Sequence, residues 1–261
     1  MNAPVDDLDA SRAPLLDHLI ELRRRLLWSL ASMAVTFGIA FYFAEDIFGF
    51  LVAPLVKAGQ SKIFYTQLFE AFFVQIKVAF FAATMLSFPV IANQLWQFVA
   101  PGLYGKEKKA LLPFLFATPF LFCSGAALAY YVAVPTALHF LLSYQGQVGG
   151  IEQEALPSVG NYLAFVMQFL FAFGIAFLLP VVLMLLERAG IVTRTQLVGA
   201  RRYAIVGCFA IALVLAPPDA GSMIMLAVPL VLLYELALIA IWFTERSRKK
   251  DADNEAVAEI A

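Results

Sequence analysis

Six long apolar stretches, separated by polar connections, dominate this sequence of 261 residues. Hydrophobic residues make up 62% of the chain and charged residues 14%, whereas ordinary soluble domains have about 45–50% and about 25%. An apolar helix needs about 20 residues to cross the hydrocarbon core of a bilayer. Because backbone polar groups find no water there, such stretches predict transmembrane helices. The fold class predicted is therefore an all-α integral membrane protein.

The lengths of the predicted spans differ along the chain. The six spans cover residues 26–44, 72–99, 111–142, 162–186, 203–216 and 222–243. The third is longer than a bilayer requires, so we expect it to tilt or to project. The fifth has only about 14 apolar residues before the turn Pro217-Pro218-Asp219. A short fifth and sixth pair predicts local thinning of the bilayer beside it.

The positive charges are distributed very unevenly between the two sides of these spans. Fifteen of the eighteen Lys and Arg residues lie before the first span, after the second and fourth spans, or in the tail. The opposite side has only Lys57 and Lys62, and Lys77 lies inside the second span. This asymmetry predicts that both termini are cytoplasmic, which agrees with an even number of spans.

The same boundaries divide the chain into three predicted parts. Residues 1–25 form a cytoplasmic leader that contains an amphipathic helix, because Asp17, His18, Glu21 and Arg25 recur at helical spacing. Residues 26–243 form one transmembrane domain of six helices. Residues 244–261 form a polar cytoplasmic tail that we expect to be disordered.

The sequence offers little for catalysis. Its two histidines, His18 and His139, belong to no metalloprotease motif, and neither a nucleophile elbow nor a phosphate-binding glycine loop is present. Cys123 and Cys208 lie in apolar stretches without metal-ligand spacing. We therefore expect no catalytic residue, no metal, no cofactor and no nucleic-acid partner, and an intramembrane hydrolase is disfavoured. A small-solute secondary transporter remains the alternative, although few charges lie at mid-membrane and no internal repeat is seen.

Two acidic residues stand out on the basic cytoplasmic side. Glu21 lies in HLIELRRRLL and Glu107 in PGLYGKEKK. Glu21 could pair with Arg25 one turn later, but such an exposed pair contributes only about 0.3–0.5 kcal/mol. Glu107 could simply favour the first turn of the next helix. Alternatively, the two carboxylates could bind two guanidinium groups of a partner through charge-assisted bonds.

Several stretches of this chain together resemble the TatC family, the multi-spanning subunit of the twin-arginine protein translocase. The resemblance extends from about residue 15 to about residue 242. The matching stretches are HLIELRRRLL (18–27), PVIANQLWQFVAPGLYGKEKK (89–109), YLAFVMQFLFAFGIAFLLP (162–180) and APPD (216–219) with the following MLAVPLVLLYEL.

The resemblance implies a fold, a function and a set of partners. The fold is a concave, glove-shaped bundle of six spans in the bacterial inner membrane, with short fifth and sixth spans. The function is a receptor for signal peptides with paired arginines, which recruits the single-span subunits TatA and TatB. Folded proteins then cross the membrane, driven by the proton-motive force. Self-association within the complex is also expected.

The resemblance also assigns roles to residues by position. Glu21 and Glu107 match the acids that bind the signal peptide, and Arg23 matches an arginine of the same leader motif. Two further positions of that site and three positions of the contact with the small subunits are carried over in the same way. They are Phe98 and Pro101 for the signal peptide, and Leu213, Val214 and Ala216 for the small subunits.

Two positions depart from the family pattern. The family commonly has an acidic residue inside the fourth span, where this chain has Leu178. A polar residue often follows the Pro-Pro-Asp turn, where this chain has Met223. The polar patch that the family places within the membrane is therefore depleted here.

Overall fold

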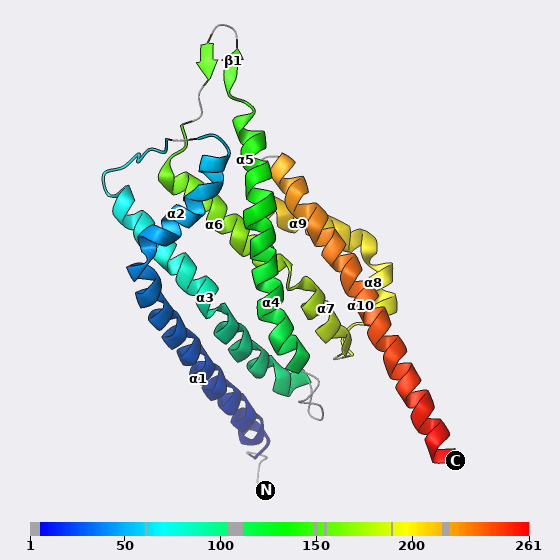
Figure 1. Ribbon diagram of the computed structural model, residues 1–261. Helices are drawn as coiled ribbons and strands as arrows, with labels where there is room; N and C mark the ends of the chain where they lie inside the picture. Colours follow the sequence, from blue (N-terminus) through cyan, green and yellow to red (C-terminus); the bar gives the residue numbers. More distant parts are fainter. Residues whose placement is uncertain are drawn as a thin grey trace. The chain divides into compact units, whose positions relative to one another are not determined.

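The computed structural model describes residues 6–60, 62–103, 112–148, 151–153, 156–188, 190–215 and 220–260 (Figure 1). In chain order its elements are α1 (Asp6–Tyr42), α2 (Ala44–Lys57), α3 (Glu70–Leu103), α4 (Leu112–Leu128), the π-helix η2 (Ala129–Ala133), α5 (Val134–Leu142), β1 (Gly146–Val148), β2 (Ile151–Gln153), α6 (Val159–Ala176), α7 (Leu179–Arg188), α8 (Arg194–Gly199), α9 (Arg201–Leu215) and α10 (Ala220–Ile260). The chain divides into two compact units. The first comprises Met1–Phe48 and Gln75–Pro119, and the second comprises Gly49–Val74 and Phe120–Ala261.

The first unit packs α1 against α3 through small residues. Ala40 on α1 and Ala79 and Ala83 on α3 are buried together, which lets the two backbones approach closely. Thr36 reinforces this contact, because its hydroxyl donates to the carbonyl oxygen of Ala83 at 3.1 Å. These contacts fix the register of α1 along α3. That register determines which side chains near the ends of the two helices meet.

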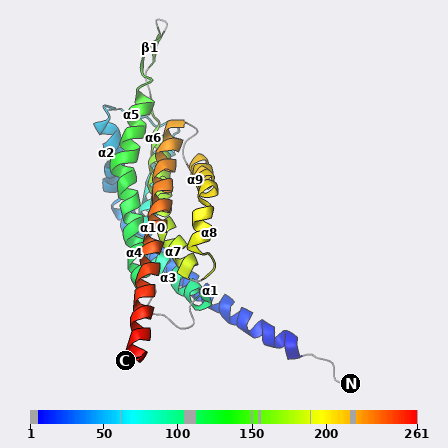
Figure 2. The same cartoon turned by 90° about the vertical axis from the view of Figure 1, so that its right-hand side faces the viewer.

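The second unit contains a core that α10 forms with α7, α8 and α9. Figures 1 and 2 both show α9 beside α10, and the two helices are in contact. Leu197, Tyr234, Leu238 and Ile241 are buried together. The Tyr234 hydroxyl donates to the Leu197 carbonyl oxygen at 2.6 Å, so this buried polar group is paired as a low-dielectric interior requires.

Two tyrosines hold helix α2 at its proline. Pro54 has no N–H and therefore cannot bond the carbonyl of Phe50, four residues earlier. The Tyr130 hydroxyl donates to that oxygen at 2.7 Å. The Tyr162 hydroxyl donates to the neighbouring carbonyl of Leu51 at 2.8 Å. Side chains from η2 and α6 thus provide donors where the helix has lost one.

Glu70 joins the connection that precedes α3 to the beginning of α6. One carboxylate oxygen accepts from the backbone N–H of Gly160 at 2.7 Å. The other accepts from the backbone N–H groups of Thr66 and Gln67 and from the Thr66 hydroxyl. Phe64 extends this junction by pairing with Ser158 as an isolated parallel bridge. Two segments about 90 residues apart are therefore tied by one carboxylate.

The structure confirms the predicted fold class. Five helical segments of the described chain are long and apolar enough to cross a membrane: His18–Tyr42, Glu70–Phe98, Leu115–Leu142, Val159–Arg188 and Met223–Arg246. They correspond to the predicted first, second, third, fourth and sixth spans. The predicted fifth span is α9, which has 15 residues and is the short helix that the sequence led us to expect.

Two local features differ from the prediction, and a third was not predicted. The fourth span is two helices, α6 and α7, because Pro180 cannot donate to the Ala176 carbonyl and the chain turns at residues 177–178. The connection after α5 contains a small antiparallel hairpin of β1 and β2. Helix α10 continues to Ile260, where the sequence predicted a disordered tail. Residues 244–260 contain no Gly or Pro and are rich in Ala, Glu, Lys and Arg, which favour helix.

Candidate functional site

One face of α1 meets the final turns of α3. His18, Glu21 and Arg25 lie on this face because they are spaced at three and four residues along a helix. The His18 imidazole stacks on the Phe98 ring, with 4.3 Å between centroids and 22° between planes. Phe98 is half-buried in this position. Glu21 lies about one turn after His18 along α1, in the direction of Tyr42.

Glu21 is paired with an arginine of its own helix. Arg25 donates from Nε and Nη2 to the same oxygen, Oε1 of Glu21, at 3.1 and 2.5 Å. The Arg25 side chain is 19% exposed, whereas that of Glu21 is 35% exposed. The carboxylate therefore remains accessible, and its other oxygen accepts no hydrogen bond from the described residues.

Arg25 also reaches across to α3. Its Nη1 donates to Oε1 of Gln97 at 2.7 Å. The Gln97 amide nitrogen in turn donates to Oδ1 of Asn93 at 2.9 Å, which fixes the amide oxygen toward the guanidinium. Glu21, Arg25, Gln97 and Asn93 thus form one continuous polar chain between the helices.

A polar pocket of about 290 Å³ opens beside this chain. Its lining consists of Glu21, Arg24, Arg25, Trp28, Gln94 and Gln97. The pocket combines one accessible carboxylate and two guanidinium groups, those of Arg24 and Arg25, with amide groups that can donate or accept hydrogen bonds. Such a lining can bind a planar cationic group on Glu21, in the manner in which Arg25 is already bound.

The structure separates the predicted site residues into three groups. Glu21 and Phe98 lie together on the α1–α3 face. Arg23 is exposed on a different face of α1, and it is not among the residues that line the polar pocket. Leu213 is 64% exposed on α9, as a residue that contacts a membrane partner would be.

The remaining predicted residues cannot be placed in the same detail. Glu107 lies outside the described residues, as do Ala216 and the turn Pro217-Pro218-Asp219. Pro101 and Val214 lie on the described backbone of α3 and α9, but their side chains are outside the described part of the chain. The proposed pairing of Glu21 with Glu107 therefore stays a prediction.

The sequence reasoning missed Asn93, Gln94 and Gln97. A signal for them was present, because these three amide side chains lie within about one turn near the end of a mostly apolar span. Asn93 and Gln97 are four residues apart, the spacing that lets two side chains of a helix bond each other. Polar groups inside a span are costly and mark functional positions by default.

Comparison with known proteins decides the family of this chain. The family model described as Sec-independent protein translocase protein (TatC) matches residues 17–229. The chain belongs to the TatC family. The family resemblance of the sequence is thus confirmed, and the chain is a multi-pass membrane protein of a protein-transport family.

Relatives in this TatC family match the chain over most of its length. It is 48% identical over 250 residues to the Sec-independent protein translocase protein TatC of Magnetococcus marinus, covering 95% of this chain and 90% of the relative. The protein of the same name from Escherichia coli strain K12 is 39% identical over 227 residues, covering 86% of each. A crystal structure of the twin-arginine translocase receptor TatC in DDM superposes with a TM-score of 0.77 at 39% identity, covering 85% of this chain and 98% of that one.

Both departures from the TatC pattern lie in described segments. Leu178 is half-buried in the turn between α6 and α7. Met223 is half-buried in the first turn of α10. Because both side chains are apolar, neither position supplies a carboxylate or an amide to the interior of this TatC-family chain.

Proposed function

We propose that this chain is the signal-peptide receptor and core subunit of a twin-arginine translocase. The single observation that carries the proposal is the state of Glu21. Its carboxylate is accessible, borders a polar pocket and already binds a guanidinium group, that of Arg25. A site that holds an internal arginine can hold an arginine of a guest peptide with the same geometry.

Binding proceeds by exchange of one arginine for another. A guest guanidinium bonds to Glu21 and displaces Arg25 from Oε1. Arg25 retains its bond to Gln97 during the exchange, so its charge is not left without a partner. The net cost is small because one charge-assisted bond replaces another.

Glu107 is the second acid of this proposal. It binds the other arginine of the pair, with Phe98 and Pro101 forming the adjoining wall. A hydrogen bond to a charged group commonly contributes about 1.5–3 kcal/mol, and loss of the Arg25 bond offsets part of this gain at the accessible Glu21. Each acid is therefore expected to contribute roughly a fivefold to tenfold preference for the paired arginines.

The remaining steps concern the membrane and the partner subunits. Both termini face the cytoplasm of a bacterial inner membrane, as the distribution of Lys and Arg favours. The single-span subunits TatA and TatB contact Leu213 and Val214 of α9 and the Ala216 that follows it in sequence, next to the predicted turn of Pro217, Pro218 and Asp219. The complex, in which the chain also self-associates, exports folded proteins with the proton-motive force, and the chain itself performs no enzymatic chemistry.

Binding of a labelled twin-arginine signal peptide to the full chain in detergent tests the proposal. We expect Glu21→Gln and Glu107→Gln each to weaken binding by roughly fivefold to tenfold and to reduce discrimination against a twin-lysine peptide. Glu235→Gln is the matched control, because Glu235 also pairs with an arginine, Arg201, at 2.8 Å. Wild-type affinity and discrimination in both test variants would contradict the receptor proposal.

A small-solute secondary transporter is not favoured as the alternative, because the family to which the chain belongs is a protein translocase. Uptake of a radiolabelled solute by the purified chain alone in liposomes would support that alternative. We expect no such uptake.

A further inference from the structure

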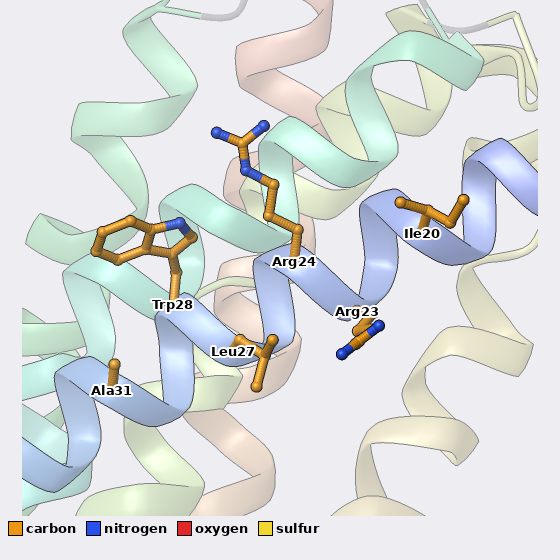
Figure 3. A pocket seen from close by; sticks show the side chains of 6 residues that line it. All are labelled: Ile20, Arg23, Arg24, Leu27, Trp28 and Ala31. Carbon is orange, nitrogen blue, oxygen red and sulfur yellow. The ribbon is translucent and has the colours of Figure 1, made fainter.

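A second pocket, of about 430 Å³, lies along the exposed surface of α1 (Figure 3). Its lining among the described residues consists of Ile20, Arg23, Arg24, Leu27, Trp28 and Ala31. In Figure 3, Arg24 and Trp28 project from one side of the helix and Arg23 and Leu27 from the other. The pocket is thus a groove between two rows of side chains of α1.

The two cations of the groove lie between apolar residues. Ile20 lies one turn nearer the N-terminus than Arg23 and Arg24, whereas Leu27 and Ala31 lie one and two turns further along, toward the other end of the span. At a rise of 1.5 Å per residue, Ala31 lies about 12 Å deeper than Arg23 along the helix. Since α1 is apolar and long enough to cross a membrane from His18 to Tyr42, Arg23 and Arg24 lie near the membrane surface at the N-terminal end of this span.

The two guanidinium groups of the groove have no anionic partner within the described chain. Neither Arg23 nor Arg24 forms an ion pair with another described residue, and both side chains are exposed. Glu21 does not line this groove. Because the groove has two cations and no carboxylate in its described lining, the paired arginines of a signal peptide are unsuited to it.

We propose that this groove binds one anionic phospholipid. The phosphate accepts charge-assisted hydrogen bonds from Arg23 and Arg24, whose planar groups suit phosphate oxygens. The part of an acyl chain nearest the headgroup lies over Leu27 and Ala31. Trp28 is 60% exposed beside them, at the depth where indole rings are enriched in membrane proteins.

The position of the groove distinguishes this lipid site from the peptide pocket. Arg24 and Trp28 line both pockets, but Arg23, Leu27 and Ala31 line only the groove. The role of Arg23 is therefore to bind lipid phosphate, whereas the family resemblance assigned it to the signal peptide. The lipid site requires only that α1 spans the membrane, and it stands even if the receptor proposal fails.

Quenching of Trp28 fluorescence by brominated lipids tests the proposal. The full chain carrying Trp96→Phe and Trp242→Phe, which retains Trp28 as its one tryptophan, is placed in phosphatidylcholine vesicles. Brominated phosphatidylglycerol is then compared with brominated phosphatidylcholine. We expect stronger quenching by the anionic lipid at equal bromine content, because each cation near the surface contributes about a fivefold preference.

Three variants make the result decisive. Arg23→Gln with Arg24→Gln should lower the apparent preference for phosphatidylglycerol by roughly tenfold or more, while Arg23→Lys with Arg24→Lys should keep part of it. Arg202→Gln should leave it unchanged, since Arg202 is also an exposed arginine beside an aromatic ring, at 4.7 Å from Tyr203, but lies outside the groove. Circular dichroism verifies that each variant is folded.

Three outcomes would overturn the lipid site. One is equal quenching by both lipids. Another is an unchanged preference in the double glutamine variant. The third is loss of the preference on adding inorganic phosphate at constant ionic strength, because the groove would then bind a soluble anion without acyl chains. If twin-arginine peptide binding fails in Glu21→Gln while the lipid preference persists, both proposals are supported separately.

Discussion

At the scale of single residues, the contact of Arg25 with Gln97 changes what the ion pair between Arg25 and Glu21 can do. The sequence predicted a weak, exposed pair between Glu21 and Arg25. In the structure the pair is partly sheltered and is extended to Gln97 on another helix. A guanidinium that has two partners can release one of them and remain bound, and an isolated surface pair cannot.

Gln97 provides the direct test of this exchange. In Gln97→Ala the displaced Arg25, whose side chain is only 19% exposed, is left with no partner, which costs more than losing one of its two partners in the free chain. We therefore expect twin-arginine peptide affinity to fall by roughly five- to tenfold. In Gln97→Glu a carboxylate holds Arg25 and frees Glu21, so affinity should be kept or raised. Peptide titration of both variants measures the difference, and a change of the same sign in both would rule out the exchange.

At the scale of elements, two close approaches determine how α6 packs in the second unit. A Cβ added at Gly174 would lie 2.6 Å from a ring carbon of Phe122, which is buried. A Cβ at Gly125 would lie 2.5 Å from the carbonyl oxygen of Phe173. Glycine is therefore required at both positions by the neighbouring atoms, and the helical sequence around them does not reveal this.

Gly174→Ala should destabilise the chain by about 1–3 kcal/mol, because a buried ring must move to admit the methyl group. Gly207→Ala is the matched control, since a Cβ at Gly207 would meet nothing within 4 Å. That variant should be neutral or slightly stabilising through higher helix propensity. Thermal unfolding in detergent compares the two, and equal melting temperatures would contradict the packing.

Helix α2 offers a second test at this scale. Tyr130→Phe should cost about 1–3 kcal/mol, because the Phe50 carbonyl then loses the donor that replaces the missing N–H of Pro54. In a Pro54→Ala background the restored N–H can bond that carbonyl, so the same tyrosine substitution should cost clearly less. A double-mutant cycle measured by thermal unfolding gives the coupling, and additive effects would show that the two groups do not share this role.

The Glu70 carboxylate, which ties the connection before α3 to the beginning of α6, offers a third test at this scale. Gly160→Ala would place a Cβ 2.8 Å from the Glu70 carboxylate oxygen and force it from the Gly160 N–H. We expect a lower melting temperature for Gly160→Ala and for Glu70→Gln, with Gly49→Ala as a control in open space. Unchanged melting temperatures in both would mean that this carboxylate does not hold the junction.

At the scale of the whole molecule, the charge asymmetry predicts the orientation of the chain in the membrane. In a variant without Cys123 and Cys208, a cysteine placed at Gln145 should react with a membrane-impermeant maleimide in intact cells. A cysteine placed at Arg246 should react only after permeabilisation, because the charge asymmetry predicts a cytoplasmic tail. The reverse pattern of labelling would contradict the predicted orientation.

The sequence by itself determined the class of protein, the positions of the apolar helices and the prominence of Glu21. These depend on hydrophobic length, residue type and helical spacing, which are all local properties. Even the short α9 could be predicted, because its length is limited by the prolines that follow it.

Only the tertiary structure decided which partners these residues have. Arg25 bonds Gln97 across 72 positions of sequence, and Tyr130 bonds the Phe50 carbonyl across 80. Such contacts depend on how two helices cross and rotate, which no local period specifies. The separation of Arg23 from Glu21 is different, because the helical period alone points residues two apart to different faces. Only packing, however, determined that the face of Glu21 meets α3 at Gln97, whereas Arg23 lies on a groove lined by α1 itself.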